Sequence, residues 1–361
     1  MGQRGPLRAM VVDDSLVIRS LISRMLGTEP AMVQVVASVA NGRLAVERAR
    51  KLDIDVIVLD IEMPVMDGIS ALPLLLEIDP ELVVIMASTL TTRNAEISLR
   101  ALSAGAKDYV PKPTTATMNS GAAEFQRDLL EKIRALGQRY RRNGHAHKPA
   151  SGLSVAAANA SAPVLRPITP NRPQVLAIGS STGGPQALSQ VLRDLPRPIK
   201  MPVFITQHMP PMFTGLLADN LARDSGLPCR EAKHGDIVTA GNVYIAPGDY
   251  HMTLAREKAN VVVKLNQNEK ESYCRPAVDP MLRSLVEIYD GKILVGVLTG
   301  MGHDGMAGAR AVIQAGGNVI AQDEASSVVW GMPGAVAKAG LCCAIVPLKQ
   351  VGHQLGTLMG R

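Results

Sequence analysis

The sequence predicts an α/β protein built of two doubly wound domains, each with a mainly parallel sheet between layers of helices. Three observations lead to this fold class. The chain has 361 residues, which is enough for two domains of ordinary size. Short apolar runs alternate with segments of helical periodicity both before residue 125 and after residue 172. Hydrophobic residues make up 47% of the chain and charged residues 19%, so both domains can form packed cores.

The first domain is expected to alternate strands and helices along its whole length. Its expected strands are short apolar runs, and its expected helices place apolar residues three or four positions apart. Strands that are separated by helices in this way lie parallel in one sheet. The expected strands cover residues 7–12, 32–39, 55–60, 82–88 and 108–110. The expected helices cover residues 15–27, 43–52, 68–77, 92–104 and 124–140.

The second domain is expected to repeat this alternation around a β-rich antiparallel insert, which covers residues 242–266. Pro185 favours the start of its first helix, because the fixed φ of proline suits a first turn. The expected strands cover residues 175–180, 202–208, 242–247, 251–257, 260–266, 293–300, 318–323 and 343–348. The expected helices cover residues 185–194, 212–223, 279–290 and 305–315.

A segment of biased composition separates the two domains. Residues 143–173 are rich in Ala, Ser, Asn and Pro and lack periodicity, which is typical of a flexible linker. The sequence therefore predicts a first domain over residues 1–125, a helical extension and flexible basic linker over 126–171, and a second domain over 172–361.

The basic excess of the chain lies in the same region. Residues 121–173 contain nine Lys or Arg residues and three acidic ones, and their net charge equals the +6 of the whole chain. The rest of the chain is therefore balanced in charge. A DNA-binding domain carries its basic residues on a folded motif, and aromatic stacking platforms are disfavoured because aromatics make up only 3% of the chain. We expect a solvated linker and no nucleic-acid partner.

The sequence favours a cytoplasmic location. No run of 18 apolar residues is present, so we expect no transmembrane helix and no membrane insertion. The first 15 residues include two acids before any signal-peptide core could form. The four cysteines form no CxxC pair and are expected to be buried thiols in a reducing compartment. They are Cys229, Cys274, Cys342 and Cys343.

Five polar residues follow the expected strands of the first domain at their carboxyl ends, the edge where open parallel sheets bind ligands. They are Asp13, Asp14, Asp60, Ser88 and Lys112. Two carboxylates can hold Mg²⁺ and a third can attack a phosphoryl group, while the hydroxyl and the ammonium hold the phosphate oxygens. A single Asp at such a position is more often a helix N-cap, but the five together favour a phosphoryl-transfer site.

Four motifs of the first domain, in order, resemble those of two-component response-regulator receiver domains, over about residues 7–125. They are VVDDS (11–15), DIEMPVMDG (60–68), IMAS (85–88) and YVPKP (109–113). This resemblance implies a flavodoxin-like fold in which Asp60 accepts a phosphoryl group from a histidine kinase. It also implies that Asp13 and Asp14, with Asp60, bind Mg²⁺. The switch residues that it implies are Ser88, Tyr109 and Lys112.

The densest motif of the second domain is LAIGSSTGGPQAL, residues 176–188. Residues 179–183 fit the G-x-S-x-G pattern of a nucleophile elbow, with Ser181 at the nucleophile position. A glycine-rich turn between a strand and a helix exposes a hydroxyl and presents backbone N–H groups to negative charge. The same turn can bind phosphate. The motif alone therefore leaves a serine hydrolase, an anion-binding loop and a plain glycine turn open.

A serine hydrolase also needs a base and an acid that orients it. His208 ends an expected strand before Met-Pro-Pro, and Asp304 follows a third strand and a glycine-rich turn. Taken singly, His208 could be an ordinary histidine and Asp304 a helix N-cap. With Ser181, however, they stand at three strand ends of one sheet, which favours a catalytic triad. The chain order Ser-His-Asp differs from the Ser-acid-His order of α/β-hydrolases, so that fold is not expected.

Three motifs of the second domain resemble the catalytic domain of the chemotaxis protein-glutamate methylesterase (CheB) family, over roughly residues 172–358. They are IGSSTGG (178–184), ITQHMP (205–210) and LTGMGHDG (298–305). A receiver joined by a linker to this domain is the architecture of that family. The predicted fold is thus a flavodoxin-like receiver followed by a Rossmann-like methylesterase domain with a β-hairpin insert.

This second resemblance implies roles for individual residues. Ser181 is the nucleophile, His208 the general base and Asp304 the acid that orients it. Thr182 and Met301 lie beside the site, with the Met301 backbone N–H as a candidate oxyanion donor. His303 stands where the family often has Asn, next to Asp304, for which it could compete.

The resemblance further implies the reaction and the partners. Members of the family hydrolyse glutamyl γ-methyl esters of methyl-accepting chemotaxis receptors, and many deamidate receptor glutamines. Both reactions pass through a tetrahedral oxyanion, so one site serves both. The phosphodonor is expected to be a histidine kinase of the chemotaxis type. Mg²⁺ is expected in the receiver only, because the second domain has no cluster of residues with metal-ligand spacing.

Two other functions compete with this one. The second domain could be a nucleotide- or phosphate-binding module, but it lacks the G-x-G-x-x-G fingerprint and the P-loop lysine. The chain could also be a receiver-linked DNA-binding regulator, but no basic unit of helix-turn-helix size follows the linker.

Overall fold

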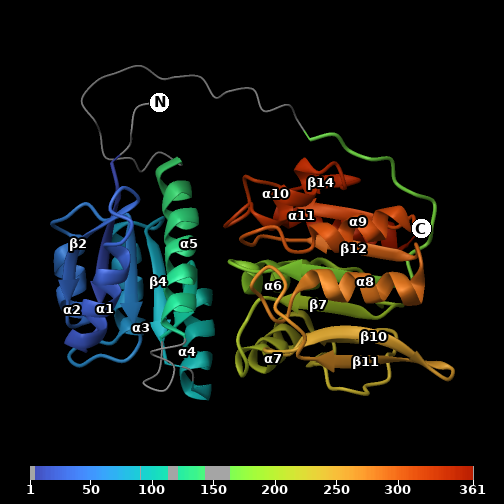
Figure 1. The fold of residues 1–361 in the computed structure, drawn as a ribbon, viewed down its shortest axis with the longest axis horizontal. Helices are drawn as coiled ribbons and strands as arrows, with labels where there is room; N and C mark the ends of the chain where they lie inside the picture. The colour runs from blue at the N-terminus through green and yellow to red at the C-terminus, as the bar shows by residue number, and fades with distance from the viewer. Residues whose placement is uncertain (1–4, 90, 113–120, 143–162, 361) are drawn as a thin grey trace. The chain divides into compact units, whose positions relative to one another are not determined.

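The computed structural model describes residues 5–89, 91–112, 121–142 and 163–360. The chain divides into two compact units, Met1–Asn159 and Ala160–Arg361. Each unit contains an open sheet of parallel strands with helices packed on it (Figure 1), which confirms the predicted fold class.

The first unit has a five-stranded parallel sheet with the strand order β2-β1-β3-β4-β5. Its strands are β1 (Leu7–Val12), β2 (Val33–Val39), β3 (Val56–Asp60), β4 (Val83–Ser88) and β5 (Asp108–Pro111). Its helices are α1 (Leu16–Leu26), α2 (Gly42–Ala49), α3 (Gly68–Ile78), α4 (Thr92–Ser103) and α5 (Ala122–Tyr140). The helices α2, α3 and α4 pack side by side, and α1 packs against α5. Strands β1, β3 and β4 are buried along nearly their whole length, as expected for a sheet that is covered on both faces.

Helix α5 belongs to this unit, although the sequence analysis assigned most of it to an extension beyond the first domain. Its side chains at helical spacing are buried against the sheet; they are Phe125, Leu129, Ile133 and Leu136. Just beyond the helix, Arg141 Nη2 lies 2.5 Å from the buried Asp55 Oδ2. Burial of one such apolar side chain contributes about 2 kcal/mol, so the helix is held by packing rather than by its own propensity.

The second unit has a seven-stranded sheet with the order β14-β13-β12-β6-β7-β9-β8 and a separate two-stranded hairpin of β10 and β11. The strands of the sheet are β6 (Val175–Ser180), β7 (Val203–Gln207), β8 (Cys229–Glu231), β9 (Val243–Ile245), β12 (Ile293–Val297), β13 (Asn318–Gln322) and β14 (Ala344–Val346). Those of the hairpin are β10 (His251–Glu257) and β11 (Asn260–Asn266).

The helices of the second unit form two groups. Helix α6 contacts both α7 and α11, whereas α9 contacts both α8 and α10. Helix α8 also packs on the hairpin strand β10 and on the central strands β6 and β12. These helices are α6 (Gly184–Asp194), α7 (Phe213–Ser225), α8 (Val278–Tyr289), α9 (Met306–Gln314), α10 (Met332–Lys338) and α11 (Leu348–Met359).

One expectation about the insert is wrong. Residues 242–247 were expected in an antiparallel insert, but β9 pairs parallel with β7 and with β8 in the main sheet. All three residues of β9 are buried, and the ring of Tyr244 stacks on that of Phe204 in β7, with ring centres 5.3 Å apart. The continuous apolar run of β9 is typical of a strand that is covered on both faces. The insert is therefore the β10–β11 hairpin alone.

The described end of the predicted linker packs on the second unit. The backbone N–H of Thr169 donates to Asn318 Oδ1 at 3.0 Å, and the Thr169 hydroxyl donates to the Gly316 carbonyl at 2.7 Å. Because these bonds join the segment to the start of β13, residues near 169 are part of the second unit and not of a free linker. Residues 143–162, which were expected to be flexible, lie outside the described residues.

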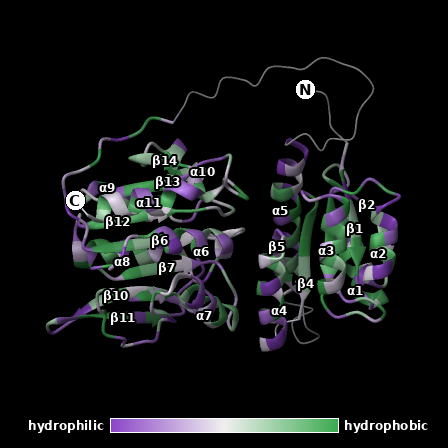
Figure 2. Cartoon of the chain, turned by 180° about the vertical axis from the view of Figure 1, so that it is seen from behind, coloured by the Kyte–Doolittle hydropathy of each residue, from purple (hydrophilic) through white to green (hydrophobic). Residues whose placement is uncertain are grey.

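Hydrophobic residues concentrate in the sheets of both units, with hydrophilic residues on the outer faces of the helices (Figure 2). In the described part of the chain, no helix combines the length and the apolar character needed to span a bilayer.

Candidate active site

Three neighbouring strands of the second unit end where the predicted catalytic residues lie. β6 pairs with β7 so that Ser180 is opposite Gln207, and the next two residues are Ser181 and His208. The His208 N–H donates to the Ser180 carbonyl at 3.1 Å. On the other side of β6, the Ser181 N–H donates to the carbonyl of Thr299, just beyond β12, at 3.0 Å. The register of the sheet thus brings Ser181, His208 and the turn after β12 to one edge.

The turn between β6 and α6 is shaped by close backbone approaches. Gly183 has φ +75°, a left-handed conformation that glycine adopts without strain. A Cβ on Gly184 would lie 1.9 Å from Gln207 Oε1, and a Cβ on Gly300 would lie 2.8 Å from the Ser181 Cβ. Side chains at these positions would displace the groups around Ser181, so the glycines allow the strand ends to meet.

The two adjacent serines have different surroundings. Ser180 is fully buried, and its hydroxyl donates to Gln207 Oε1 at 2.7 Å. Ser181 is partly exposed, so it is the serine of the pair that solvent reaches. The structure therefore assigns Ser180 to the packing of the site and leaves Ser181 available for chemistry.

Gln207 links these residues, and the sequence analysis did not identify it. Its Nε2 donates to the Ser181 carbonyl at 2.9 Å and to the His208 carbonyl at 3.1 Å, while its Oε1 accepts from Ser180. The side chain is 2% exposed. A polar residue at the end of an apolar strand, next to a candidate histidine, is the signal that could have pointed to it.

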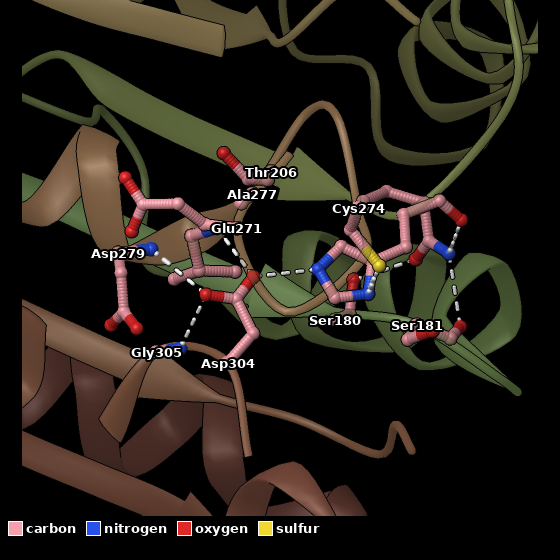
Figure 3. A network of polar contacts seen from close by, with 12 residues as sticks. Ser180, Ser181, Thr206, Glu271, Cys274, Ala277, Asp279, Asp304 and Gly305 are labelled. Carbon is pink, nitrogen blue, oxygen red and sulfur yellow. Dashed lines mark hydrogen bonds and ion pairs between the residues drawn. The ribbon is translucent and has the colours of Figure 1, made fainter. Parts of the chain in front are cut away.

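His208 and Asp304 form a direct pair. His208 Nε2 lies 2.7 Å from Asp304 Oδ2, and the Asp304 side chain is 1% exposed (Figure 3). The pairing of Nε2 with the carboxylate leaves Nδ1 as the nitrogen that can accept a proton from a nucleophile. The structure thus brings together the predicted base and the predicted acid.

Helix α8 holds the Asp304 carboxylate by its N-terminal backbone. Asp304 Oδ2 accepts from the Val278 N–H at 2.6 Å, and Oδ1 accepts from the N–H groups of Asp279 at 3.1 Å and Gly305 at 2.8 Å. These donors and the positive end of the helix dipole stabilise a buried negative charge. His303, which the sequence analysis named as a possible competitor for Asp304, is exposed, and these bonds to Asp304 come from other residues.

The pKa values of the site follow from these contacts. Burial alone would lower the pKa of His208, but the neighbouring Cys274 and Asp304 outweigh it and raise this pKa to about 10. Burial would raise the pKa of Asp304, yet the hydrogen bonds from His208 and from α8 hold it below its usual value. The pKa of Asp279 shifts in the opposite direction, because burial and the charge of Asp304 raise it to about 6. Asp304 is therefore the first of these two carboxyl groups to ionise as the pH rises.

The remaining predicted residues lie in the turns next to Ser181. Thr182 is buried, and its carbonyl accepts from the Thr299 hydroxyl at 2.8 Å. Met301 is half-buried and follows Gly300, at which an added Cβ would lie 2.8 Å from the Ser181 Cβ. The role of its N–H as an oxyanion donor stays a prediction.

The carboxyl edge of the first unit holds an acidic cluster. Carboxylate oxygens of Asp13, Asp14 and Asp60 all lie within 4.8 Å of one another. Lys112 Nζ lies 2.5 Å from Asp13 Oδ2 and 2.6 Å from Asp60 Oδ1. Burial outweighs the lysine and raises the pKa of Asp60 to about 6. Three carboxylates at this spacing suit a hard cation such as Mg²⁺, so the donor set fits the expected metal.

The predicted switch residues differ in their distance from this cluster. The Lys112 N–H donates to the Ser88 carbonyl at 2.7 Å, so these two residues lie side by side at the strand ends. Ser88 is buried, and its hydroxyl is 3.2 Å from that of Ser98. Tyr109 lies on β5 opposite Met86 of β4, and its ring is buried. The structure brings Ser88 and Lys112 to the cluster, and it places Tyr109 further back along the sheet.

Comparison with known proteins places both units in described families. A family model described as CheB methylesterase matches residues 176–355, and one described as response regulator receiver domain matches residues 9–119. The chain is 52% identical to the protein-glutamate methylesterase/protein-glutamine glutaminase of group 2 operon of Rhodospirillum centenum, covering 100% of this chain and 96% of that protein. It is 51% identical to protein-glutamate methylesterase/protein-glutamine glutaminase 1 of Rhodospirillum rubrum, covering 96% and 94%.

Among solved structures, the crystal structure of the Thermotoga maritima CheB methylesterase catalytic domain is similar to this chain with a TM-score of 0.50 and 41% identity. The match covers 52% of this chain and 98% of that one.

The contacts of Gln207 generate a prediction. Gln207→Leu keeps the volume of the side chain but removes the donor to the Ser181 and His208 carbonyls. We expect the rate at which a serine-directed fluorophosphonate labels Ser181 to fall by about 100-fold, because small displacements of a nucleophile and its base cost that much. Gln314→Leu, at an exposed glutamine of α9, is the matched control and should label at the wild-type rate. Wild-type labelling of a folded Gln207→Leu protein would contradict this role.

Proposed function

The chain belongs to the CheB methylesterase family and carries a response regulator receiver domain, and we propose that Ser181, His208 and Asp304 form its catalytic triad. Like its relatives, the protein is a protein-glutamate methylesterase/protein-glutamine glutaminase, a hydrolase that acts on esterified glutamate and on glutamine side chains. The observation that carries the triad is the 2.7 Å contact between His208 Nε2 and Asp304 Oδ2 beside the Ser181 turn.

The proposed reaction begins with attack of the Ser181 hydroxyl on the carbonyl carbon of a glutamyl γ-methyl ester. His208 Nδ1 takes the hydroxyl proton, and Asp304 stabilises the imidazolium that forms. The Met301 N–H is proposed as a donor to the oxyanion, and one such donor typically contributes about 3–4 kcal/mol. His208 then returns the proton to the departing methoxide, methanol leaves, and water hydrolyses the acyl-enzyme by the reverse sequence. With a glutamine side chain the leaving group is ammonia.

The receiver is proposed to regulate this reaction through Asp60. The Asp60 carboxylate attacks the phosphoryl group of a phosphohistidine, and the Lys112 ammonium, 2.6 Å from Asp60 Oδ1, pairs with the phosphoryl oxygens. Asp13 and Asp14, with Asp60, would hold the Mg²⁺ that neutralises charge during the transfer. We propose methyl-accepting chemotaxis receptors as substrates, a histidine kinase of the chemotaxis type as phosphodonor, and the cytoplasm as the location.

The two adjacent serines give the first test of the triad. Ser181→Ala removes the nucleophile, so methanol release from methylated receptors should fall by roughly 10⁴-fold or more. Ser180→Ala leaves the nucleophile in place and removes only the donor to Gln207, at a cost of about 1–3 kcal/mol in folding stability. This variant should keep most of the activity. Undiminished methanol release by Ser181→Ala would exclude the triad.

The proposed regulation predicts that stimulation of the esterase by a phosphodonor depends on Asp60. Addition of acetyl phosphate and Mg²⁺ should raise methanol release by the wild-type protein. Asp60→Asn cannot form the acyl phosphate, so the rate of methanol release by this variant should stay at the unstimulated level. Mass spectrometry should find no phosphate on the variant. The exposed Asp67, which caps α3, provides the control Asp67→Asn, which keeps the capping oxygen and should respond to acetyl phosphate. Stimulation of Asp60→Asn equal to that of the wild type would refute control through this residue.

A further inference from the structure

Cys274 lies against the catalytic imidazole, and neither the proposed reaction nor the family motifs use it. It belongs to the segment between β11 and α8, and its Sγ is 3.3 Å from His208 Nδ1. That nitrogen is the one that the pairing of Nε2 with Asp304 leaves for proton transfer. Figure 3 shows the resulting chain of contacts, which runs from Asp304 at one end to Cys274 at the other.

The backbone around Cys274 is fixed by several bonds. Cys274 and Glu271 exchange two backbone hydrogen bonds, with N to O distances of 2.9 Å and 3.2 Å. The next residue, Arg275, forms an ion pair with Asp249 in which Nη2 and Oδ1 are 2.7 Å apart. Tyr273 has a positive φ of 63°, an uncommon conformation for a residue with a side chain. The sulfur is thus held beside the imidazole by a defined loop.

An imidazole next to a thiol promotes ionisation of that thiol. The proton exchanges between the sulfur and the ring. The neutral ring is the form that the proposed hydrolysis uses, and the imidazolium form stabilises the thiolate, which is the nucleophilic form of cysteine. Cys274 is also partly exposed, so a small reagent can reach it.

The other cysteines provide internal comparisons. Cys229 has the same intermediate exposure as Cys274, but burial raises its pKa to about 11, and its sulfur is 4.0 Å from the Ser225 hydroxyl. Cys342 and Cys343 are buried, and burial raises the pKa of Cys342 to about 12. Thiol reagents should therefore prefer Cys274 to Cys229, because Cys274 has an imidazole contact and burial makes Cys229 less reactive.

We propose that Cys274 is a thiol modification site coupled to the esterase, at which peroxides and alkylating electrophiles react and thereby block His208 Nδ1. The blocking effect rests on the proposed role of His208 as the base. With hydrogen peroxide, the thiolate sulfur attacks one peroxide oxygen, the O–O bond breaks and an S–O bond forms. The sulfur is oxidised to a sulfenic acid, and the peroxide is reduced to hydroxide, which takes the imidazolium proton and leaves as water.

Modification should stop hydrolysis because the added group occupies the space at Nδ1 from which Ser181 must transfer its proton. Sulfenic acid formation is reversible, since two equivalents of a small thiol reduce it to the free cysteine and release water and a disulfide. Alkylation by iodoacetamide is not reversible in this way, because it forms a thioether. The two reagents therefore distinguish reversible oxidation from permanent blockage at the same sulfur.

The first experiment measures reactivity without reference to enzyme activity. The full-length protein is treated with iodoacetamide at pH 7, and mass spectrometry follows the modification of each cysteine over time. We expect Cys274 to react at least about tenfold faster than Cys229, because the imidazole promotes reaction at Cys274 whereas burial raises the pKa of Cys229 to about 11. In His208→Ala the rate at Cys274 should fall toward that of Cys229. Equal rates at the two cysteines in the wild type, or an unchanged rate at Cys274 in His208→Ala, would overturn the proposed coupling.

The second experiment measures the effect on hydrolysis. Wild-type protein should lose methanol release in step with modification of Cys274 by peroxide, and dithiothreitol should restore it. The ratio of treated to untreated activity should stay near one in Cys274→Ser, whose hydroxyl does not form a sulfenic acid. Full activity of wild-type protein that is completely alkylated at Cys274 would overturn the blocking role. A failure of the triad assignment appears separately, as activity in Ser181→Ala, and does not affect the alkylation rates.

Discussion

The proposed chemistry of the second unit depends on the hydrogen bonds that hold the Asp304 carboxylate at the N-terminus of α8. An unpaired buried carboxylate costs several kcal/mol, but the backbone N–H groups of Val278, Asp279 and Gly305 solvate this one. Asp279 stands at the same helix end, and burial together with the charge of Asp304 raises its pKa to about 6, so Asp304 is the first of the two to ionise. The fixed carboxylate orients His208 and decides which ring nitrogen remains for chemistry.

The two units use one topological rule for two kinds of site. In both, the strands of a parallel sheet deliver polar side chains to their carboxyl ends, where the loops leave room for a ligand. In the first unit the carboxylates of Asp13 and Asp60 lie close together, and the Lys112 ammonium compensates their charge. In the second unit backbone N–H groups at a helix end perform that task for Asp304, which contacts only the Nε2 side of the imidazole. The two sites, proposed as a phosphoryl acceptor and an acid–base site, thus differ in the source of the compensating charge.

Local patterns in the sequence predict much of this structure, and contacts between distant segments account for the rest. The alternation of apolar runs and helical periods was sufficient for the first sheet and for most of the second, apart from β8 and the parallel pairing of β9. The strand-end positions of Ser181, His208 and Asp304 indicated a common edge. The role of Gln207 depends on the register of β6 and β7, which pairs it with Ser180, 27 residues away. Cys274 reaches His208 from a loop 66 residues along the chain. The strand β8 and the helix α10 are too short to show a clear periodic pattern, and the sheet and neighbouring helices stabilise them. Helix α11, in contrast, places Val351, Leu355 and Leu358 at helical spacing, a signal that the sequence analysis did not use.

The pKa of His208 is the quantity that tests the central role of Asp304 most directly. An NMR titration of the imidazole in the wild-type protein should give a pKa well above the ordinary value of about 6.5, because Cys274 and the Asp304 carboxylate both favour the imidazolium. In Asp304→Asn the amide removes this charge and keeps the shape of the side chain, so the pKa should fall by at least about one unit. An equal pKa in the two proteins would show that Asp304 does not control the imidazole, and the account of the site would be contradicted.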